Sequence, residues 1–417
     1  MSEGGSNSGV APDANPQTTQ VPAEVKSSRW SFLNKAKEKV KGWVTRGVED
    51  KNYSIGDENV KLSYKEFKPK EGEVKDPEEA IFFLVGAPVR AKASFVWPQL
   101  EPMANQLKTQ VYTVDARPQG YFHSNSIDLE VEAIRRFIED INKKRKEEGV
   151  KELKKITIYG HSIGGGVKGI SLAVALEQFN PEIGIKAVVA ANPVGFYDQD
   201  KEELLVRKVI PELRKVTSNQ NPRVSHPFPP KVIWEAIGSI AADLSATSRP
   251  KKLFEEQLQA ITQKNPNLAK IKSPVVLVLA KDDSWSEAEK IVPKEEIEKR
   301  LTPPKTIDQI RLELSGSKRW DSFTVADKEV RINQIMDQFA DPEYLRKYRI
   351  SETKFRRNKA KRGYLKEEVM PQANAIGVIE VEKYAHHGAL AERPQTPHLI
   401  VNIQRVVDKL AAQPKAA

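Results

Sequence analysis

The chain has 417 residues, of which 39% are hydrophobic and 30% are charged, a balance that allows a sizeable core beneath a strongly solvated surface. It contains no cysteine, which excludes disulfides, thiolate metal sites and cysteine nucleophiles. Lys and Arg outnumber Asp and Glu by 67 to 57, and this net charge of +10 favours anionic neighbours.

The first 51 residues are expected to stand apart from the core. Residues 1–27 are rich in Ser, Gly, Asn, Gln and Pro, so we predict that they are disordered. They lack the basic and apolar regions of a secretory signal, and no apolar run in the chain approaches the roughly 20 residues of a membrane-spanning helix. We therefore expect a cytoplasmic protein, at most peripheral to a membrane. Within the segment 28–51, residues 28–47 predict a basic amphipathic helix, which can lie on an anionic membrane or, more commonly, pack against the protein itself.

From residue 52 onward, short apolar runs alternate with helical periods. The predicted strands are 60–67, 81–85, 111–114, 156–159, 187–191, 275–280 and 375–381, and the predicted helices include 127–141, 167–178 and 397–410. Continuous apolar runs of strand length suit strands that are covered on both faces. The alternation predicts an α/β fold, a doubly wound and mostly parallel sheet.

Two segments interrupt this alternation and divide the predicted core into residues 52–197, 271–286 and 374–417. Residues 198–270 are helical in composition and are predicted to form a lid. Residues 287–373 form a charged insert, and its segment 345–366 carries ten basic residues against one acidic residue, with aromatic residues interleaved. This composition suits contact with single-stranded nucleic acid or with phospholipid head groups, although a solvated helix is the commoner outcome. We expect an anionic membrane surface as a partner, through residues 28–47 and 345–366, and do not expect nucleic acid.

The strongest local signal is Gly160-His161-Ser162-Ile163-Gly164, which matches G-x-S-x-G directly after one predicted strand and before a predicted helix. A serine on so tight a turn has strained backbone angles, so the residues two before and two after it must be small. Its hydroxyl is then presented above the sheet, and the next amide faces the substrate oxygen. The alternative, a nucleotide-binding turn, requires G-x-G-x-x-G and an acidic residue about 20 positions later, which this stretch does not match.

On these residues the chain resembles the α/β-hydrolase-fold proteins of the esterase and lipase type, over about residues 52–412 outside the two inserts. The resemblance implies that Ser162 is the nucleophile of a triad in the order serine, acid, histidine. Leu84-Val85-Gly86-Ala87-Pro88 stands in the place of the family's His-Gly-x-Pro loop, with Val85 replacing the histidine. The backbone N–H groups of Ala87 and Ile163 would then form the oxyanion hole. Residues 114–120 resemble a structural D-x-R-G-x-G stretch that follows the fourth strand.

The same resemblance assigns the other two members of the triad and leaves a reserve candidate for each. Asp283 lies three residues beyond the end of the strand 275–280 and is the expected acid, with Asp282 as the alternative. His387 is the expected base because its spacing to Pro394 fits the family's H-x6-P pattern, with His386 as the alternative.

The predicted activity is hydrolysis of a carboxylic ester, on a small-molecule or lipid substrate, through an acyl-enzyme on Ser162. An amidase or acyltransferase that uses the same triad and a non-catalytic binding protein remain as alternatives. Serine at the nucleophile position argues against the dehalogenases and epoxide hydrolases of this fold, which use aspartate. No cofactor is expected, and no metal site is expected because the chain has no H-E-x-x-H and no other ligand cluster.

Overall fold

The computed structural model describes residues 47–70, 74–86, 97–204, 245–280, 283, 287–301, 322–328, 352–381 and 397–412. The predicted disordered tail and almost all of the predicted helix at 28–47 lie outside the described residues. So do residues 205–244 of the predicted lid and residues 302–321 and 329–351 of the basic insert.

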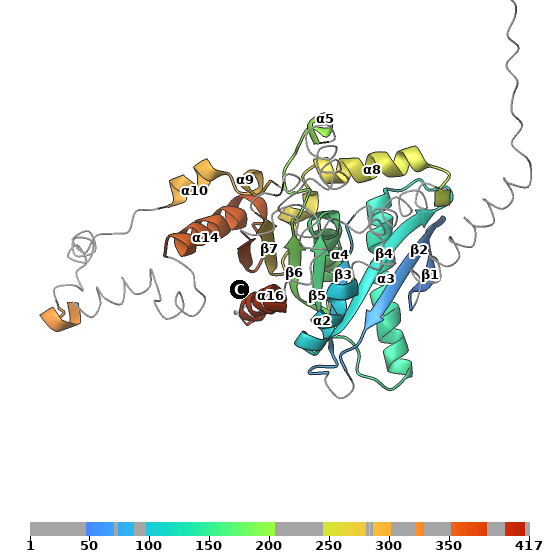
Figure 1. The fold of residues 1–417 in the computed structure, drawn as a ribbon, viewed down its shortest axis with the longest axis horizontal. Helices are drawn as coiled ribbons and strands as arrows, with labels where there is room; N and C mark the ends of the chain where they lie inside the picture. Colours follow the sequence, from blue (N-terminus) through green and yellow to red (C-terminus); the bar gives the residue numbers. More distant parts are fainter. Residues whose placement is uncertain are drawn as a thin grey trace, which may run out of the picture. The chain divides into compact units, whose positions relative to one another are not determined.

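One sheet of eight strands organises the described residues (Figure 1). Its strands are β1 (Glu49–Ile55), β2 (Glu58–Phe67), β3 (Glu79–Leu84), β4 (Gln110–Gln119), β5 (Lys155–His161), β6 (Gly184–Ala191), β7 (Val275–Ala280) and β8 (Ile376–Val381). Their order is β1-β2-β4-β3-β5-β6-β7-β8. Only the β1–β2 and β2–β4 pairs are antiparallel. The carboxyl ends of β3 to β8 therefore meet along one side of the sheet, which we call the carboxyl edge.

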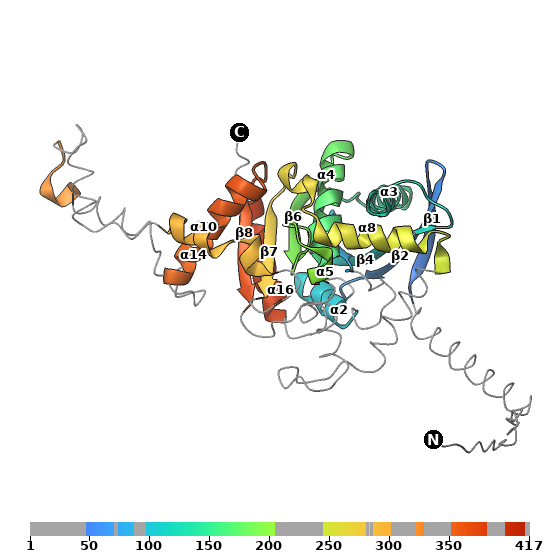
Figure 2. The same ribbon diagram turned by 90° about the horizontal axis from the view of Figure 1, so that it is seen from above.

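Helices cover both faces of this sheet (Figure 2). One face packs against α3 (Ser126–Glu147), α4 (Ile170–Phe179) and α8 (Pro250–Thr262), and the other against α2 (Trp97–Leu107) and α16 (Pro397–Ala411). The remaining described helices are η1 (Gly164–Gly169), α5 (Lys201–Glu203), η3 (Pro266–Ala269), α9 (Ala288–Ile291), α10 (Lys294–Arg300), α14 (Glu352–Tyr364) and η4 (Leu365–Val369). Within the described part of the chain, no helix is both long and apolar enough to cross a membrane.

The apolar runs are buried on both sides because alternate residues of a strand point to opposite faces. In β7, Val275, Leu277 and Leu279 join the core cluster on the sheet face that carries α3 and α4. Val276 and Val278 join the core beneath α16. The prediction of a mostly parallel sheet wound with helices on both faces is confirmed.

Two details of the predicted elements were wrong. The strand β1 begins at Glu49, before residue 52, where we expected the core to start, and its pairing with β2 was not predicted. The stretch at 114–120 was expected to follow the fourth strand, but all of it except Gly120 lies within β4, because β2 pairs along it as far as Asn59 opposite Gln119.

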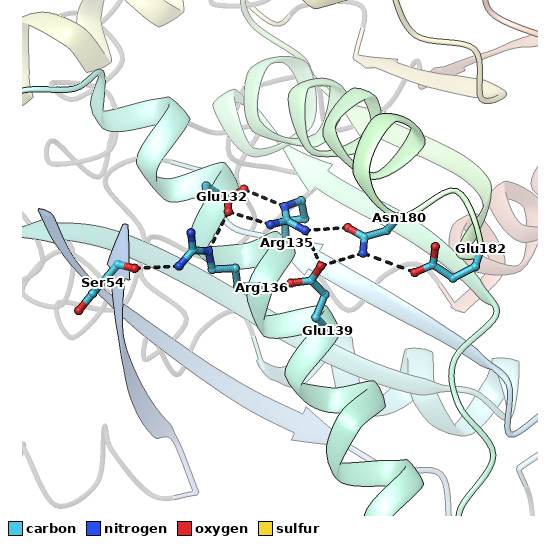
Figure 3. A network of polar contacts seen from close by, with 7 residues as sticks. All are labelled: Ser54, Glu132, Arg135, Arg136, Glu139, Asn180 and Glu182. Carbon is cyan, nitrogen blue, oxygen red and sulfur yellow. Dashed lines mark hydrogen bonds and ion pairs between the residues drawn. The ribbon is translucent and has the colours of Figure 1, made fainter. Parts of the chain in front are cut away.

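A polar network on the outer side of α3 joins that helix to both neighbouring elements (Figure 3). Arg135 binds Glu132 within its own helix and donates to Asn180 Oδ1, at the end of α4, at 2.9 Å. Arg136 donates to the backbone carbonyl of Ser54, in β1, at 2.8 Å. These contacts tie α3 to the end of α4 on one side and to the edge strand β1 on the other.

Candidate active site

Ser162 occupies the turn between β5 and the π-helical segment η1. Its φ of +57° lies in the left-handed region that non-glycine residues seldom adopt, and its side chain is buried, with 3% of the residue exposed. The Ser162 N–H donates to Ala191 O at 2.9 Å, and its carbonyl accepts from the N–H groups of Gly165 and Gly166. The chain thus passes from strand to helix within a single residue.

The glycines of the motif are required because the backbone segments around Ser162 touch one another. A Cβ on Gly160 would lie 2.3 Å from the carbonyl oxygen of Gly164. A Cβ on Gly164 would lie 2.3 Å from the carbonyl oxygen of Leu84, at the end of β3. Neither position can accept a larger residue without a backbone shift, which is the steric reason for the G-x-S-x-G pattern.

A side chain from the end of the first insert, residues 198–270, binds the helical turn that follows Ser162. Asn265 is buried, and its Nδ2 donates to the carbonyls of Gly166 and Val167, both at 3.2 Å. Its N–H donates to Gly195 O at 2.7 Å. Sequence reasoning missed Asn265, and the only signal for it was a turn-forming Asn-Pro pair before η3.

The loop predicted to form the oxyanion hole starts directly against the serine. A Cβ on Gly86 would lie 3.0 Å from His161 O and 3.2 Å from Ser162 Cβ. Ile163 is fully buried beside it. Ala87 lies outside the described residues, so the pairing of its N–H with that of Ile163 stays a prediction.

Asp283, the predicted acid, lies just beyond β7 at the carboxyl edge and is 3% exposed. Its N–H donates to Ala280 O at 3.3 Å, and its carbonyl accepts from the N–H of Glu287 at 3.1 Å. Tyr197 donates its hydroxyl to Glu287 Oε2 at 3.0 Å. Burial raises the pKa of Tyr197 above its ordinary value, and the charges of Glu287 and then Asp283 raise it further, so Asp283 lies within electrostatic reach of this pair. The alternative acid, Asp282, lies outside the described residues.

The two candidate bases, His386 and His387, also lie outside the described residues. The structure does fix where the chain leaves the sheet before them. β8 pairs in parallel with β7 and ends at Val381, opposite Ala280. The segment that carries both histidines therefore starts at the carboxyl edge, next to the strand that leads to Asp283.

Four buried charged residues lie on the α3 face of the sheet. Arg117 Nη1 lies 2.6 Å from Asp115 and 3.1 Å from Glu130, and Lys168 Nζ lies 2.5 Å from Glu130. Gln257, from α8, also donates to Glu130, at 2.9 Å. Burial lowers the pKa of Lys168, as does the nearby Arg117, whereas the two carboxylates raise the pKa of Arg117 despite its burial. This charged cluster, which has two positive and two negative members, joins β4, α3 and η1, the helical turn directly behind Ser162.

Of the side chains that the structure describes, no group of three or more His, Asp or Glu residues could hold a metal ion. Ser162, Ile163 and Asp283 lie at the carboxyl ends of β5 and β7, and these two strands are separated by β6 alone. A strained serine, a buried carboxylate and a flanking glycine therefore lie along one edge of the sheet.

No family model matches the sequence, and no curated protein matches it. Among solved structures, the chain is similar to a probable hydrolytic enzyme from Pseudomonas aeruginosa, with 13% identity over 88% of this chain and 94% of that one and a TM-score of 0.44. It is similar to a bacterial membrane phospholipase A, with 14% identity over 92% of each chain and a TM-score of 0.46. It is also similar to a putative lipase from Acinetobacter baumannii, with 15% identity over 90% and 96% and a TM-score of 0.45. The strand order, the parallel run from β4 to β8 and the strained serine turn after β5 together show that this chain has the α/β-hydrolase fold.

Proposed function

We propose that this chain is a serine hydrolase that cleaves a carboxylic ester, with Ser162 as its nucleophile. The observation that carries the proposal is the conformation of Ser162, a buried non-glycine residue held at φ +57° between β5 and η1. Strain of this kind costs about 1–3 kcal/mol and persists where the surrounding structure enforces it, most often at functional sites. Here Gly160, Gly164 and Gly86 are the residues whose lack of a side chain permits it.

The proposed reaction has two steps. The Ser162 hydroxyl attacks the ester carbonyl while His387, or its neighbour His386, removes the hydroxyl proton. The same imidazolium then protonates the departing alkoxide, which leaves an acyl-enzyme. Water attacks the acyl-enzyme with the histidine again acting as base, and the acid product leaves as Ser162 regains its proton. Asp283 orients the imidazole and stabilises its positive charge.

The N–H groups of Ala87 and Ile163 are proposed to bind the oxyanion that forms on the carbonyl oxygen. Two observations support this assignment. Ile163 directly follows the nucleophile, and Gly86, the residue before Ala87, lies against Ser162. Each such donor contributes on the order of 3–4 kcal/mol to the stabilisation of the transition state.

A fluorophosphonate probe, which reacts with activated serines, tests the proposal. We expect the wild-type protein to be labelled and Ser162→Ala to be inert. Ser63→Ala is the matched control, since Ser63 is a buried serine on β2 whose hydroxyl binds Asp50. The proposal is supported if wild type and Ser63→Ala are labelled and Ser162→Ala is not. A wild-type protein that resists the probe would contradict it and favour the non-catalytic binding protein.

A panel of p-nitrophenyl esters of graded acyl length, with Ser162→Ala as the control, then identifies the substrate class. Hydrolysis of short esters alone indicates a small-molecule substrate, and preference for long acyl chains indicates a lipid. Labelling by the probe without hydrolysis of any ester would favour the amidase or acyltransferase alternative. Product analysis with alcohol acceptors tests the acyltransferase.

We further propose that an anionic lipid surface is a partner, through residues 28–47 and 345–366. Most of these residues lie outside the described part of the chain, but α14 supplies a described portion of the second segment. It packs against β8 and α10, with Lys361 paired to Glu380, and leaves Arg357 and Lys359 exposed. Flotation at low salt with phosphatidylserine vesicles tests this partner. We expect co-flotation that weakens in Arg357→Ala/Lys359→Ala, and recovery only in the lipid-free fraction would overturn it.

A further inference from the structure

Asn192 directly follows β6 and is fully buried. Its N–H donates to Val278 O at 2.8 Å, which continues the ladder between β6 and β7 by one bond. In a parallel ladder, the next bond would run from the N–H of Ala280 to the main-chain carbonyl of residue 192. Instead, Ala280 N donates to the side-chain Oδ1 of Asn192 at 3.0 Å. The side chain thus takes the place of a main-chain acceptor at the point where β6 ends.

The bond from Ala280 N to Asn192 Oδ1 holds the last residue of β7. We call residues 281–286, which follow Ala280 and include Asp283, the acid loop. Ala280 is the last residue of β7, and its carbonyl accepts from the N–H of Asp283. Ala280 is therefore bonded to Asn192 through its N–H and to Asp283 through its carbonyl. If the first bond is lost, the last turn of chain before Asp283 loses its attachment to β6.

The end of β6 at Asn192 is also linked by a hydrogen bond to Ser162, the proposed nucleophile. Ala191, the residue before Asn192, accepts the N–H of Ser162 at 2.9 Å. A path of three hydrogen bonds and short backbone segments therefore connects Ser162, just after β5, to Asp283, just after β7. The end of β6, at Asn192, is the middle of this path.

Residues with strained backbone angles lie along the same path of hydrogen bonds. Among the described residues, four non-glycine residues have a positive φ, namely Lys108, Ser162, Asn192 and Glu287. Three of these lie on or beside the path, and the N–H of Glu287 donates to Asp283 O. Asn192, with φ +44°, is of a residue type that tolerates the left-handed region, and this conformation is the one in which its side chain meets Ala280.

We infer that Asn192 is a positioning residue that fixes the acid loop relative to the nucleophile through its bond to the Ala280 N–H. The inference deepens the proposed function and rests on it, because the position of Asp283 matters to catalysis only if Asp283 acts on the base. Asn192 acts through Ala280 and is not assigned a contact with substrate.

The test compares Asn192→Gly with the wild-type protein. Glycine adopts a positive φ freely, so this variant keeps the backbone conformation while it removes the side chain that supplies the acceptor for Ala280. Asn180→Gly is the matched control, because Asn180 is a buried asparagine that closes α4 far from the carboxyl edge and binds Arg135 and Glu139. The measured quantity is the rate of fluorophosphonate labelling of Ser162 as a function of pH.

We expect Asn192→Gly to label about 10²-fold more slowly at its plateau, the effect of a displacement of about 1 Å in a catalytic group. The apparent pKa of the rate should also fall, because a displaced Asp283 stabilises the imidazolium less. Amide hydrogen exchange gives a second measurement that needs no activity, and exchange at Ala280 should be faster in Asn192→Gly. Asn180→Gly should leave the labelling rate, its pH midpoint and the Ala280 exchange unchanged.

The outcomes separate this inference from the function on which it rests. If wild type is not labelled, the proposed function fails and the catalytic role of Asn192 fails with it. If wild type is labelled but Asn192→Gly keeps its rate and pH midpoint, the inference alone is overturned. A slower rate without a change in the midpoint or in Ala280 exchange would show a merely structural role and would also overturn it. Asn192→Asp keeps an acceptor oxygen of the same reach, and rapid exchange at Ala280 in that folded variant would contradict the assigned bond even if Asn192→Gly does not fold.

Discussion

Removal of one charge from the buried cluster behind the serine turn should destabilise the fold strongly. Lys168 Nζ lies 2.5 Å from Glu130, and both side chains are at most 3% exposed. With an effective dielectric constant of about 20, two unit charges at this separation attract by roughly 7 kcal/mol. The desolvation of the lysine offsets part of this attraction. We therefore expect Lys168→Met to lower the free energy of unfolding by about 3–5 kcal/mol, because it leaves Asp115 and Glu130 facing Arg117 alone.

A double-mutant cycle in urea measures this coupling. Glu130→Gln alone leaves an excess positive charge and should also destabilise, but the double variant Lys168→Met/Glu130→Gln restores neutrality with the Arg117–Asp115 pair intact. We expect it to cost less than the sum of the single variants by about 1–3 kcal/mol. Lys144→Met, at an exposed lysine on α3, is the control and should change the free energy of unfolding by no more than about 0.5 kcal/mol. Strict additivity in the cycle would refute the reasoning that the cluster acts as one neutral unit.

Three further predictions concern single side chains. Gly86→Ala places a Cβ 3.2 Å from Ser162 Cβ, so we expect fluorophosphonate labelling to slow by about 10²-fold, and an unchanged labelling rate would show that the loop after β3 can move aside. Asn265→Ala removes two hydrogen bonds to the backbone carbonyls of Gly166 and Val167, each worth about 0.5–1.5 kcal/mol, so urea unfolding should show a loss of about 1–3 kcal/mol in the free energy of unfolding. A loss below about 0.5 kcal/mol would contradict this role. The hydrogen bonds from Arg135, and then those from Arg136, hold the pKa of Glu132 below its ordinary value of 4.5 despite partial burial. The stabilisation that Glu132 contributes is therefore present above that value and is lost as the pH falls through the lower, folded-state pKa. The difference in unfolding free energy between wild type and Glu132→Gln should accordingly shrink between about pH 7 and about pH 3, and a constant difference would contradict this assignment.

The strands that could be predicted from the sequence are those with an apolar run of strand length. The run at 275–280 is apolar throughout because β7 is covered on both faces, and its predicted bounds match the strand. β1 has the sequence EDKNYSI, in which only Tyr53 and Ile55 pack against the core. Its strand conformation depends on pairing with β2 rather than on a pattern of its own. The same pairing extends β4 to Gln119, beyond its apolar residues.

In the candidate site, too, the features set by neighbouring residues could be predicted, and those set by residues far apart in the sequence could not. The serine turn could be predicted because its constraint is local, with Gly160 and Gly164 meeting each other across four positions of the chain. Asn265 could not, because it reaches Gly166 across 99 positions and has no sequence signature that names its partner. Asn192 looks like an ordinary turn residue after a strand, and only the ladder between β6 and β7 shows that its side chain replaces a backbone acceptor.

The segment 198–270 was predicted from the sequence to form a lid, but residues near its end contact the core and the turn at Ser162. Leu253 of α8 belongs to the core on the sheet face that carries α3 and α4, and Gln257 donates to Glu130 in the charged cluster. The described end of the segment is therefore part of the core rather than a separate lid. Asn265 then holds the helical turn that follows Ser162. Before it enters β7, the chain that returns from the insert therefore contributes Gln257 and Asn265, which bind groups next to the Ser162 turn. A change in residues 250–270 is expected to act on the reactivity of Ser162 through these contacts, whereas any effect of the insert on substrate choice would have to come from other residues.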